Sequence, residues 1–171
     1  MREPDRIELY ILRHAIAADR DAWAGREDRN RPLTDEGIVK LREVVRGMRA
    51  LGLSFGRILS SPFLRARQTA EIVAADMRFK GVVESSPHLA PGGEAGAMID
   101  EINVSRAGPV LLVGHEPGLS QLISMLLAGN TVTGITLKKA SLCKLVAPTL
   151  RYARCASLEW LLAPAQSRRI R

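Results

Sequence analysis

The sequence IELYILRH, residues 7–14, is an apolar run that ends in Arg13 and His14. Its apolar residues follow one another with little alternation, which is typical of a strand buried on both faces of a parallel sheet. A second run, VLLVGH at residues 110–115, ends in His115 in the same way. Because ligands bind at the carboxyl ends of parallel strands, we expect both histidines at one site.

A third segment, RILSSPFLRARQTA at residues 57–70, joins a short apolar run to a helical pattern. The run predicts a strand over residues 57–61, and the pattern predicts a helix over residues 64–77 with Arg65 in its first turn or so. A helix that follows a parallel strand begins at the carboxyl edge of the sheet. Arg65 is therefore expected beside the two histidines.

The rest of the chain alternates between helical and strand patterns. Thr34 and Gly52 are the predicted N-cap and C-terminal stop of one helix. Further helices are predicted over residues 95–102 and 117–127, and further strands near residue 82 and over residues 110–113, 131–137, 141–146 and 152–160. Residues 17–31 are polar and aperiodic and are predicted to form a loop. The order indicates a single domain over residues 1–171, a three-layer α/β/α fold with a mostly parallel sheet.

The composition agrees with a compact globular protein. With 46% hydrophobic and 25% charged residues, the chain is expected to be globular rather than disordered. No apolar stretch approaches the ~20 residues of a membrane helix, and we do not expect the charged N-terminus to act as a secretory signal. The two cysteines, Cys143 and Cys155, show no metal-ligand spacing. We expect a cytoplasmic protein that needs no metal or organic cofactor.

The net charge of +7 is the unusual feature of the composition. A basic surface could attract nucleic acid, an acidic protein or small phosphates. The excess is spread along the chain, and the one dense basic segment, SRRIR at residues 167–171, is expected to be a frayed terminus. We do not expect nucleic acid as a partner, since no nucleic-acid-binding motif accompanies the charge.

The two histidines and two arginines expected at this sheet edge suit a phosphoryl group. A neutral imidazole at His14 could attack phosphorus, and the guanidinium groups of Arg13 and Arg65 match phosphate oxygens with two parallel hydrogen bonds. His115, if protonated near bound phosphate, would stabilise the charge on its oxygens. Each residue alone could be structural or could form an ordinary ion pair. Their joint occurrence at three strand ends favours a phosphate site.

Four ordered motifs, LYILRHA, RPLTDEG, SSPFLRARQTA and VGHEPGLS, resemble the signatures of the histidine phosphatase (phosphoglycerate mutase-like) superfamily. Within it, the chain resembles the short bacterial phosphohistidine phosphatases of the SixA type. The resemblance implies that His14 is a nucleophile that forms a phosphohistidine intermediate, and that Arg13, Arg65 and His115 complete the phosphate pocket. It also implies that Arg31, in RPLT, joins the pocket or its rim.

Two departures from the superfamily pattern bear on the substrate. Ala15 replaces the glycine of the usual RHG motif, as it often does in SixA-like members. The longer segment that carries an acidic proton donor in larger relatives is missing, and the nearby carboxylates are Glu84 and Glu94, of which Glu94 could reach the pocket from a glycine-rich turn. Imidazole leaving from phosphohistidine needs less protonation than a sugar alcohol does. The absence of a strong donor therefore favours a P–N substrate.

Three functions remain open at this point. The first is a phosphatase that acts on phosphohistidine in a partner protein, such as a histidine-phosphotransfer domain. A pocket without capping insertions should be shallow and open, which suits a phosphorylated side chain on a folded partner. The second is a phosphomonoesterase for small phosphate esters on the same fold. The third, a non-catalytic binder of phosphate or of a phosphoprotein, is disfavoured because both histidines and both arginines are intact.

Overall fold

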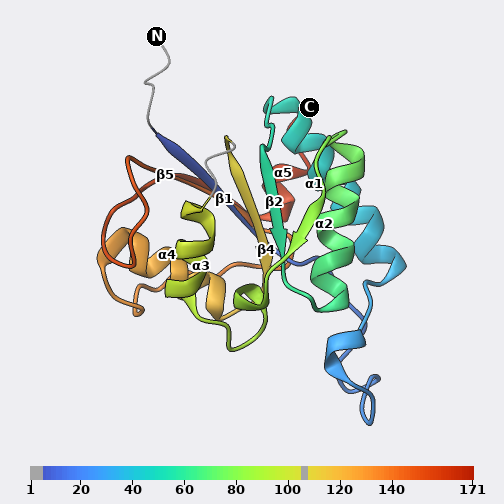
Figure 1. Cartoon of the computed structure of the whole chain (residues 1–171). Helices are drawn as coiled ribbons and strands as arrows, with labels where there is room; N and C mark the ends of the chain where they lie inside the picture. Colours follow the sequence, from blue (N-terminus) through green and yellow to red (C-terminus); the bar gives the residue numbers. More distant parts are fainter. Residues whose placement is uncertain (1–5, 105–107) are drawn as a thin grey trace.

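A computed structural model of the chain, which describes residues 6–104 and 108–171, has a six-stranded sheet at its centre (Figure 1). The strands are β1 (Ile7–Arg13), β2 (Arg57–Ser60), β3 (Val83–Ser85), β4 (Val110–Gly114), β5 (Leu142–Ala147) and β6 (Ser157–Leu162). Their order across the sheet is β3-β2-β4-β1-β5-β6. Strands β1 to β4 pair in parallel, β5 is antiparallel to β1, and β6 is antiparallel to β5. Among these strands only β5 runs against the others, which confirms the mostly parallel sheet.

Helices cover both faces of the sheet. They are α1 (Asp35–Ala50), α2 (Leu64–Asp76), α3 (Ala95–Asn103), α4 (Gly118–Ala128) and the short α5 (Pro164–Ser167), with 3-10 turns η1 (Asp28–Asn30) and η2 (Pro87–Leu89). Figure 1 shows α1 and α2 on one face and α3 and α4 on the other. Successive residues of β1 face opposite layers: Leu9 and Ile11 pack in the α3–α4 core, and Tyr10 and Leu12 pack in the α1–α2 core. The predicted three layers are confirmed.

The first turn of α1 packs directly against the chain that leaves β1. Thr34 caps this helix as predicted, since its Oγ1 accepts a hydrogen bond from the Gly37 N–H at 3.0 Å. A Cβ on Gly37 would lie 2.1 Å from the carbonyl oxygen of Ile16, so glycine permits this close approach. The Thr34 N–H donates to the same carbonyl at 3.0 Å. Both ends of the 17–31 loop are therefore held beside the end of β1.

The prediction of a strand over residues 131–137 is wrong, because this segment has no sheet partner. Its backbone donors bind side chains instead. The Val132 N–H donates to Asn130 Oδ1 and the Thr133 N–H donates to Ser124 Oγ, both at 3.0 Å. The β-branched composition thus reflects a loop held against α4. The last strand also begins later than predicted, at Ser157 rather than near residue 152.

The prediction of a frayed C-terminus is wrong for its first residues. Ser167 ends α5 and is buried, with a relative exposure of 2%. Its carbonyl oxygen would lie 2.0 Å from a Cβ on Gly47, so a glycine in α1 lets the tail pack directly on that helix. Arg168 follows with an ion pair to Glu43 at 3.7 Å. The basic tail is therefore anchored beside α1.

In residues 6–104 and 108–171, no helix combines the length and the hydropathy that crossing a bilayer requires. The same residues contain no group of three or more His, Cys, Asp or Glu side chains placed to hold a metal ion. Cys143 and Cys155 are both free thiols.

Candidate active site

The carboxyl ends of three adjacent strands form the site. Strand β4 lies between β1 and β2, and all three are parallel. His14 follows β1, His115 follows β4, and Arg65 lies in the first turn of α2 after β2. The His14 N–H donates to the carbonyl of Gly114 at 3.1 Å, which fixes the first histidine against the strand that carries the second. The parallel topology therefore brings together residues that are up to about a hundred positions apart in sequence.

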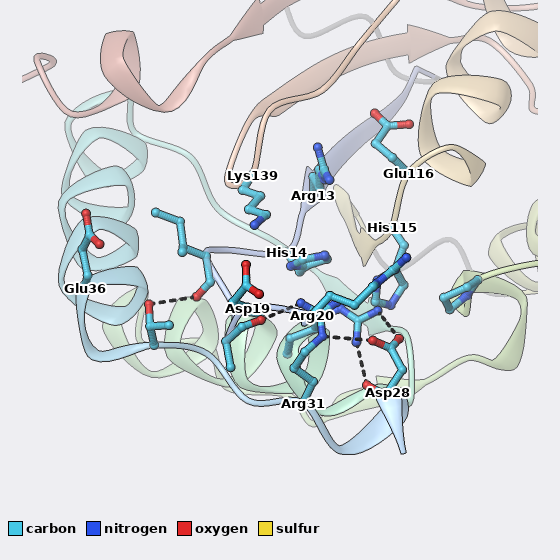
Figure 2. Close-up of a pocket in the computed structure, with 16 residues that line it drawn as sticks. Arg13, His14, Asp19, Arg20, Asp28, Arg31, Glu36, His115, Glu116 and Lys139 are labelled. Atoms are coloured by element: carbon cyan, nitrogen blue, oxygen red, sulfur yellow. Dashed lines mark hydrogen bonds and ion pairs between the residues drawn. The ribbon is translucent and has the colours of Figure 1, made fainter. Parts of the chain in front are cut away.

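A cavity of about 600 Å³ opens at this edge of the sheet. Arg13, His14, Arg65 and His115 all line it, and Arg31 joins them from the 17–31 loop. Figure 2 shows Arg13, His14, Arg31 and His115 gathered around the cavity. The structure thus places five of the six predicted site residues at one cavity.

His14 is held in the form that a nucleophile requires. Its Nδ1 lies 2.7 Å from the carbonyl oxygen of Ala15. Because a carbonyl can only accept, Nδ1 carries the proton and Nε2 keeps a free lone pair. Burial, together with the charges of His115, Arg65 and Arg13, lowers the pKa of His14 to about 3. The imidazole is therefore neutral at physiological pH.

His115 faces His14 across the cavity, with ring centroids 5.0 Å apart. Its Nε2 lies 2.8 Å from Ser61 Oγ, and that oxygen accepts a hydrogen bond from the Phe63 N–H at 3.2 Å. The Ser61 hydroxyl proton is thus available to Nε2, which leaves the imidazole proton on Nδ1. Burial and the charge of Arg65 lower the pKa of His115 to about 3, so it is neutral until an anion binds beside it.

Arg31 and Arg65 hold the carboxylate of Asp28 between them. Arg65 donates from Nη1 to the Asp28 carbonyl at 2.9 Å and from Nη2 to its Oδ2 at 3.0 Å. Arg31 donates from Nε to Oδ1 at 2.9 Å. Burial raises the pKa of Asp28, but the hydrogen bonds and charges of the two arginines outweigh it and hold the pKa below its usual range. An ionised Asp28 thus ties the 17–31 loop to α2.

Three buried nitrogens of the residues around this cavity have no hydrogen-bond partner. Arg13 Nε, Arg65 Nε and His115 Nδ1 are three of the four buried side-chain atoms of this kind in residues 6–104 and 108–171. An unpaired buried donor costs about 1–3 kcal/mol, and native proteins leave few of them. All three can donate a hydrogen bond. The three residues that carry these nitrogens all line the same cavity.

The sequence profile of the histidine phosphatase superfamily (branch 1) matches residues 9–90. The phosphohistidine phosphatase SixA of Escherichia coli is 32% identical over 128 residues, which cover 73% of this chain and 77% of that protein. The chain belongs to the histidine phosphatase superfamily.

Further comparisons agree with this assignment. A protein of Picosynechococcus, itself uncharacterised, is 42% identical over 145 residues, which cover 80% of this chain and 82% of that protein. The structure of the protein histidine phosphatase SixA complexed with tungstate matches with a TM-score of 0.80 and 26% identity, over 93% of this chain and 98% of that one. This histidine phosphatase is thus a phosphoryl-group hydrolase, and its fold is confirmed.

Asp28 is one of the cavity residues of this histidine phosphatase that the sequence analysis did not predict. It lies in η1, inside the segment predicted only as a loop. The available signal was its position three residues before Arg31, in EDRNR, where a 3-10 turn brings a carboxylate back to an arginine. The contact with Arg65, 37 residues away in sequence, leaves no local pattern.

The two carboxylates considered as proton donors lie elsewhere. Glu94 is the exposed N-cap of α3 and does not line the cavity, although Pro91 from the same turn does. The turn therefore reaches the cavity with an apolar residue rather than with its acid. Glu84 forms a bidentate pair with Arg57, with contacts of 2.8 and 2.7 Å, which lowers the pKa of its carboxyl group.

Replacing Ser61 by alanine is expected to lower kcat/KM by roughly tenfold, the scale of one lost hydrogen bond in the transition state. Without the hydroxyl, nothing holds the proton of His115 on Nδ1, and the ring loses its anchor at Nε2. The measurement is kcat/KM against pH. We expect a changed pH profile in the Ser61→Ala variant and recovery in Ser61→Thr.

Ser60→Ala is the matched control for this prediction. Ser60 is equally buried, and its hydroxyl donates to the Ser61 carbonyl at 3.0 Å rather than to a histidine. It should therefore leave the pH profile unchanged. If both serine variants lose activity equally and keep the wild-type pH profile, Ser61 does not orient His115.

Proposed function

We propose that this histidine phosphatase removes the phosphoryl group from phosphohistidine on a partner protein, through a covalent phosphohistidine at His14. One observation carries the proposal: Arg13, Arg65 and His115, each with an unpaired buried nitrogen, line the same cavity as a neutral His14. Arranged in this way, they suit a tetrahedral phosphoryl group beside a nucleophile.

In the first step, the Nε2 lone pair of His14 attacks phosphorus in line with the bond to the substrate nitrogen. The Nε2–P bond forms, the P–N bond of the substrate breaks, and its electron pair stays on the departing imidazole. The other nitrogen of that ring can carry a proton, so the ring leaves neutral. Arg13, Arg65 and a proton-donating His115 stabilise the oxygens of the transferring group.

In the second step, water attacks the phosphoenzyme from the side that the leaving group vacated. The new P–O bond forms, and the Nε2–P bond breaks with its electrons returning to His14. Inorganic phosphate leaves, one proton of the water remains on it, and the other passes to solvent. The Nδ1–H bond to the Ala15 carbonyl persists through both steps and keeps the ring in one tautomer.

The carboxyl groups at the cavity support a substrate with a good leaving group. Three carboxyl groups with lowered pKa values line the cavity: Asp19, Asp28 and Glu36. Backbone hydrogen bonds lower the pKa of Asp19, and Lys40 lowers that of Glu36. At Asp28 burial raises the pKa, but the two arginines outweigh it. Glu116 accepts hydrogen bonds at both oxygens, from the Leu137 N–H and from Ser120 Oγ. None of these groups is arranged as the strong general acid that an alkoxide leaving group requires.

The surroundings of the cavity favour a side chain of a folded protein over an enclosed metabolite. In larger relatives the superfamily pattern places an insertion between the second arginine and the second histidine. Here the described part of that segment folds into β3, η2 and α3, and it contributes Pro91 alone to the cavity lining. A phosphorylated side chain projecting from a partner, such as a histidine-phosphotransfer domain, could therefore reach His14.

The test compares turnover of a phosphohistidine-bearing protein with turnover of a panel of sugar and glycerate phosphates, with the His14→Ala variant as the blank. We expect kcat/KM for phosphohistidine to exceed that for any ester by about 10²-fold or more, since the esters lack a good leaving group. An ester turned over as fast as phosphohistidine would instead place the enzyme in small-molecule metabolism.

A further inference from the structure

Lys139 lies on a turn that is bonded to the catalytic strand end. The Ala140 N–H donates to the carbonyls of Arg13 at 3.1 Å and His14 at 3.2 Å, and the Arg13 N–H donates to the carbonyl of Ser141 at 3.2 Å. Arg13 Nη1 also donates to the Leu137 carbonyl at 2.6 Å. The backbone on both sides of Lys139 is therefore fixed relative to the phosphate site.

Lys139 also lies at the junction of two cavities. It lines the catalytic cavity, where Figure 2 shows its side chain extending toward His14. It also lines a neighbouring cavity of about 130 Å³ that shares Ile16 with the first. The cationic residues of this second cavity are Lys40, Lys139 and Arg168, and no carboxylate lines it. We call these three cations and the space between them the basic subsite.

In the part of the chain that the structure describes, Lys40 and Arg168 each have a carboxylate partner and Lys139 has none. Burial and the charges of Arg13 and Arg31 lower the pKa of Lys139, and the charge of Asp19 opposes them only in part. Among the described residues, no carboxylate oxygen lies within 4.0 Å of its Nζ. Lys40 and Arg168 pair with Glu36 and Glu43 near the surface, and such pairs are weak enough to exchange for another anion.

We propose that the basic subsite binds an acidic side chain that lies close to the phosphorylated histidine of the partner protein. This inference rests on the proposed function, because it requires a protein substrate. A segment whose phosphoryl group is bound at His14 passes over Lys139, and an aspartate or glutamate beside the phosphohistidine then reaches the three cations. The flexible ammonium groups of Lys40 and Lys139 suit a carboxylate that approaches from solvent.

The experiment uses phosphohistidine peptides in which one glutamate is moved through about three positions on either side of the phosphohistidine, each matched by a glutamine peptide. The wild-type enzyme should prefer the glutamate peptide at one or two positions, by about fivefold in KM with little change in kcat. The preference should vanish in Lys139→Met, survive in Lys139→Arg, and fade as salt is raised. Lys138→Met is the matched control, since Lys138 lines neither cavity.

A second readout separates this inference from the proposed function. Peptide affinity is measured with the inactive His14→Ala protein, alone and combined with Lys139→Met. If the affinity for glutamate peptides is higher and this preference depends on Lys139, the subsite is supported. Failure of the wild-type enzyme to turn over any of the peptides would remove the proposed function but not the subsite. Equal affinities for glutamate and glutamine peptides at every position, or a preference that persists in Lys139→Met, would overturn the subsite.

Discussion

His14→Ala is expected to abolish turnover of phosphohistidine and of every phosphate ester, with a loss of roughly 10³-fold or more in kcat. The variant removes Nε2, the one lone pair that we assign to attack on phosphorus. Arg13, Arg65 and His115 would still bind phosphate, but no covalent intermediate could form. The loss should therefore appear in kcat, while inorganic phosphate still binds as a competitive inhibitor.

The fold should survive this substitution. The His14 side chain makes one hydrogen bond, from Nδ1 to the Ala15 carbonyl, and its loss costs about 1 kcal/mol. A thermal melt of the variant checks that the activity was not lost through unfolding. Acid and base quenching of the wild-type enzyme during turnover should trap a base-stable, acid-labile phosphoenzyme that is absent from the variant. Substantial residual turnover, or a phosphoenzyme still formed by the variant, would remove His14 as the nucleophile.

Arg65→Lys is expected to lower kcat/KM by about 10²–10³-fold although it keeps the positive charge. Arg65 uses Nη1 and Nη2 to bind the carbonyl and carboxylate of Asp28, and its buried Nε has no partner. A lysine has one ammonium group, which cannot span both Asp28 oxygens and also reach a phosphoryl oxygen. The variant therefore loses a phosphate donor and one anchor of the 17–31 loop.

Arg57→Lys is the matched control for the Arg65 variant. Arg57, in β2, also makes a two-pronged pair with a carboxylate, through Nε and Nη2 to Glu84, and it does not line the cavity. The same change of fork to ammonium should therefore leave kcat/KM unchanged. If Arg65→Lys keeps wild-type kcat/KM, or if Arg57→Lys loses as much, the geometry of the Arg65 guanidinium is not what the reaction requires.

The position of the candidate active site could be predicted from local sequence because strands buried on both faces need continuous apolar runs. Residues 7–12 and 110–113 have that pattern, and polar residues directly after such runs must lie at the carboxyl edge of a parallel sheet. His14 and His115 follow from this rule alone. The helix boundary at Thr34 was also predictable, since N-capping depends on a few adjacent residues.

Contacts between distant segments were decided only in the folded chain. Asp28 meets Arg65 because the 17–31 loop returns to α2, and Glu94 is excluded because its turn presents Pro91 to the cavity. Lys139 joins the site because its turn binds the backbone of β1. The sequence by itself therefore determined most of the strands and the positions of the two histidines, since burial on both faces leaves continuous apolar runs. The tertiary structure decided which charged side chains surround them, because an ion pair between distant segments depends on how loops return to the sheet and leaves no pattern along the chain.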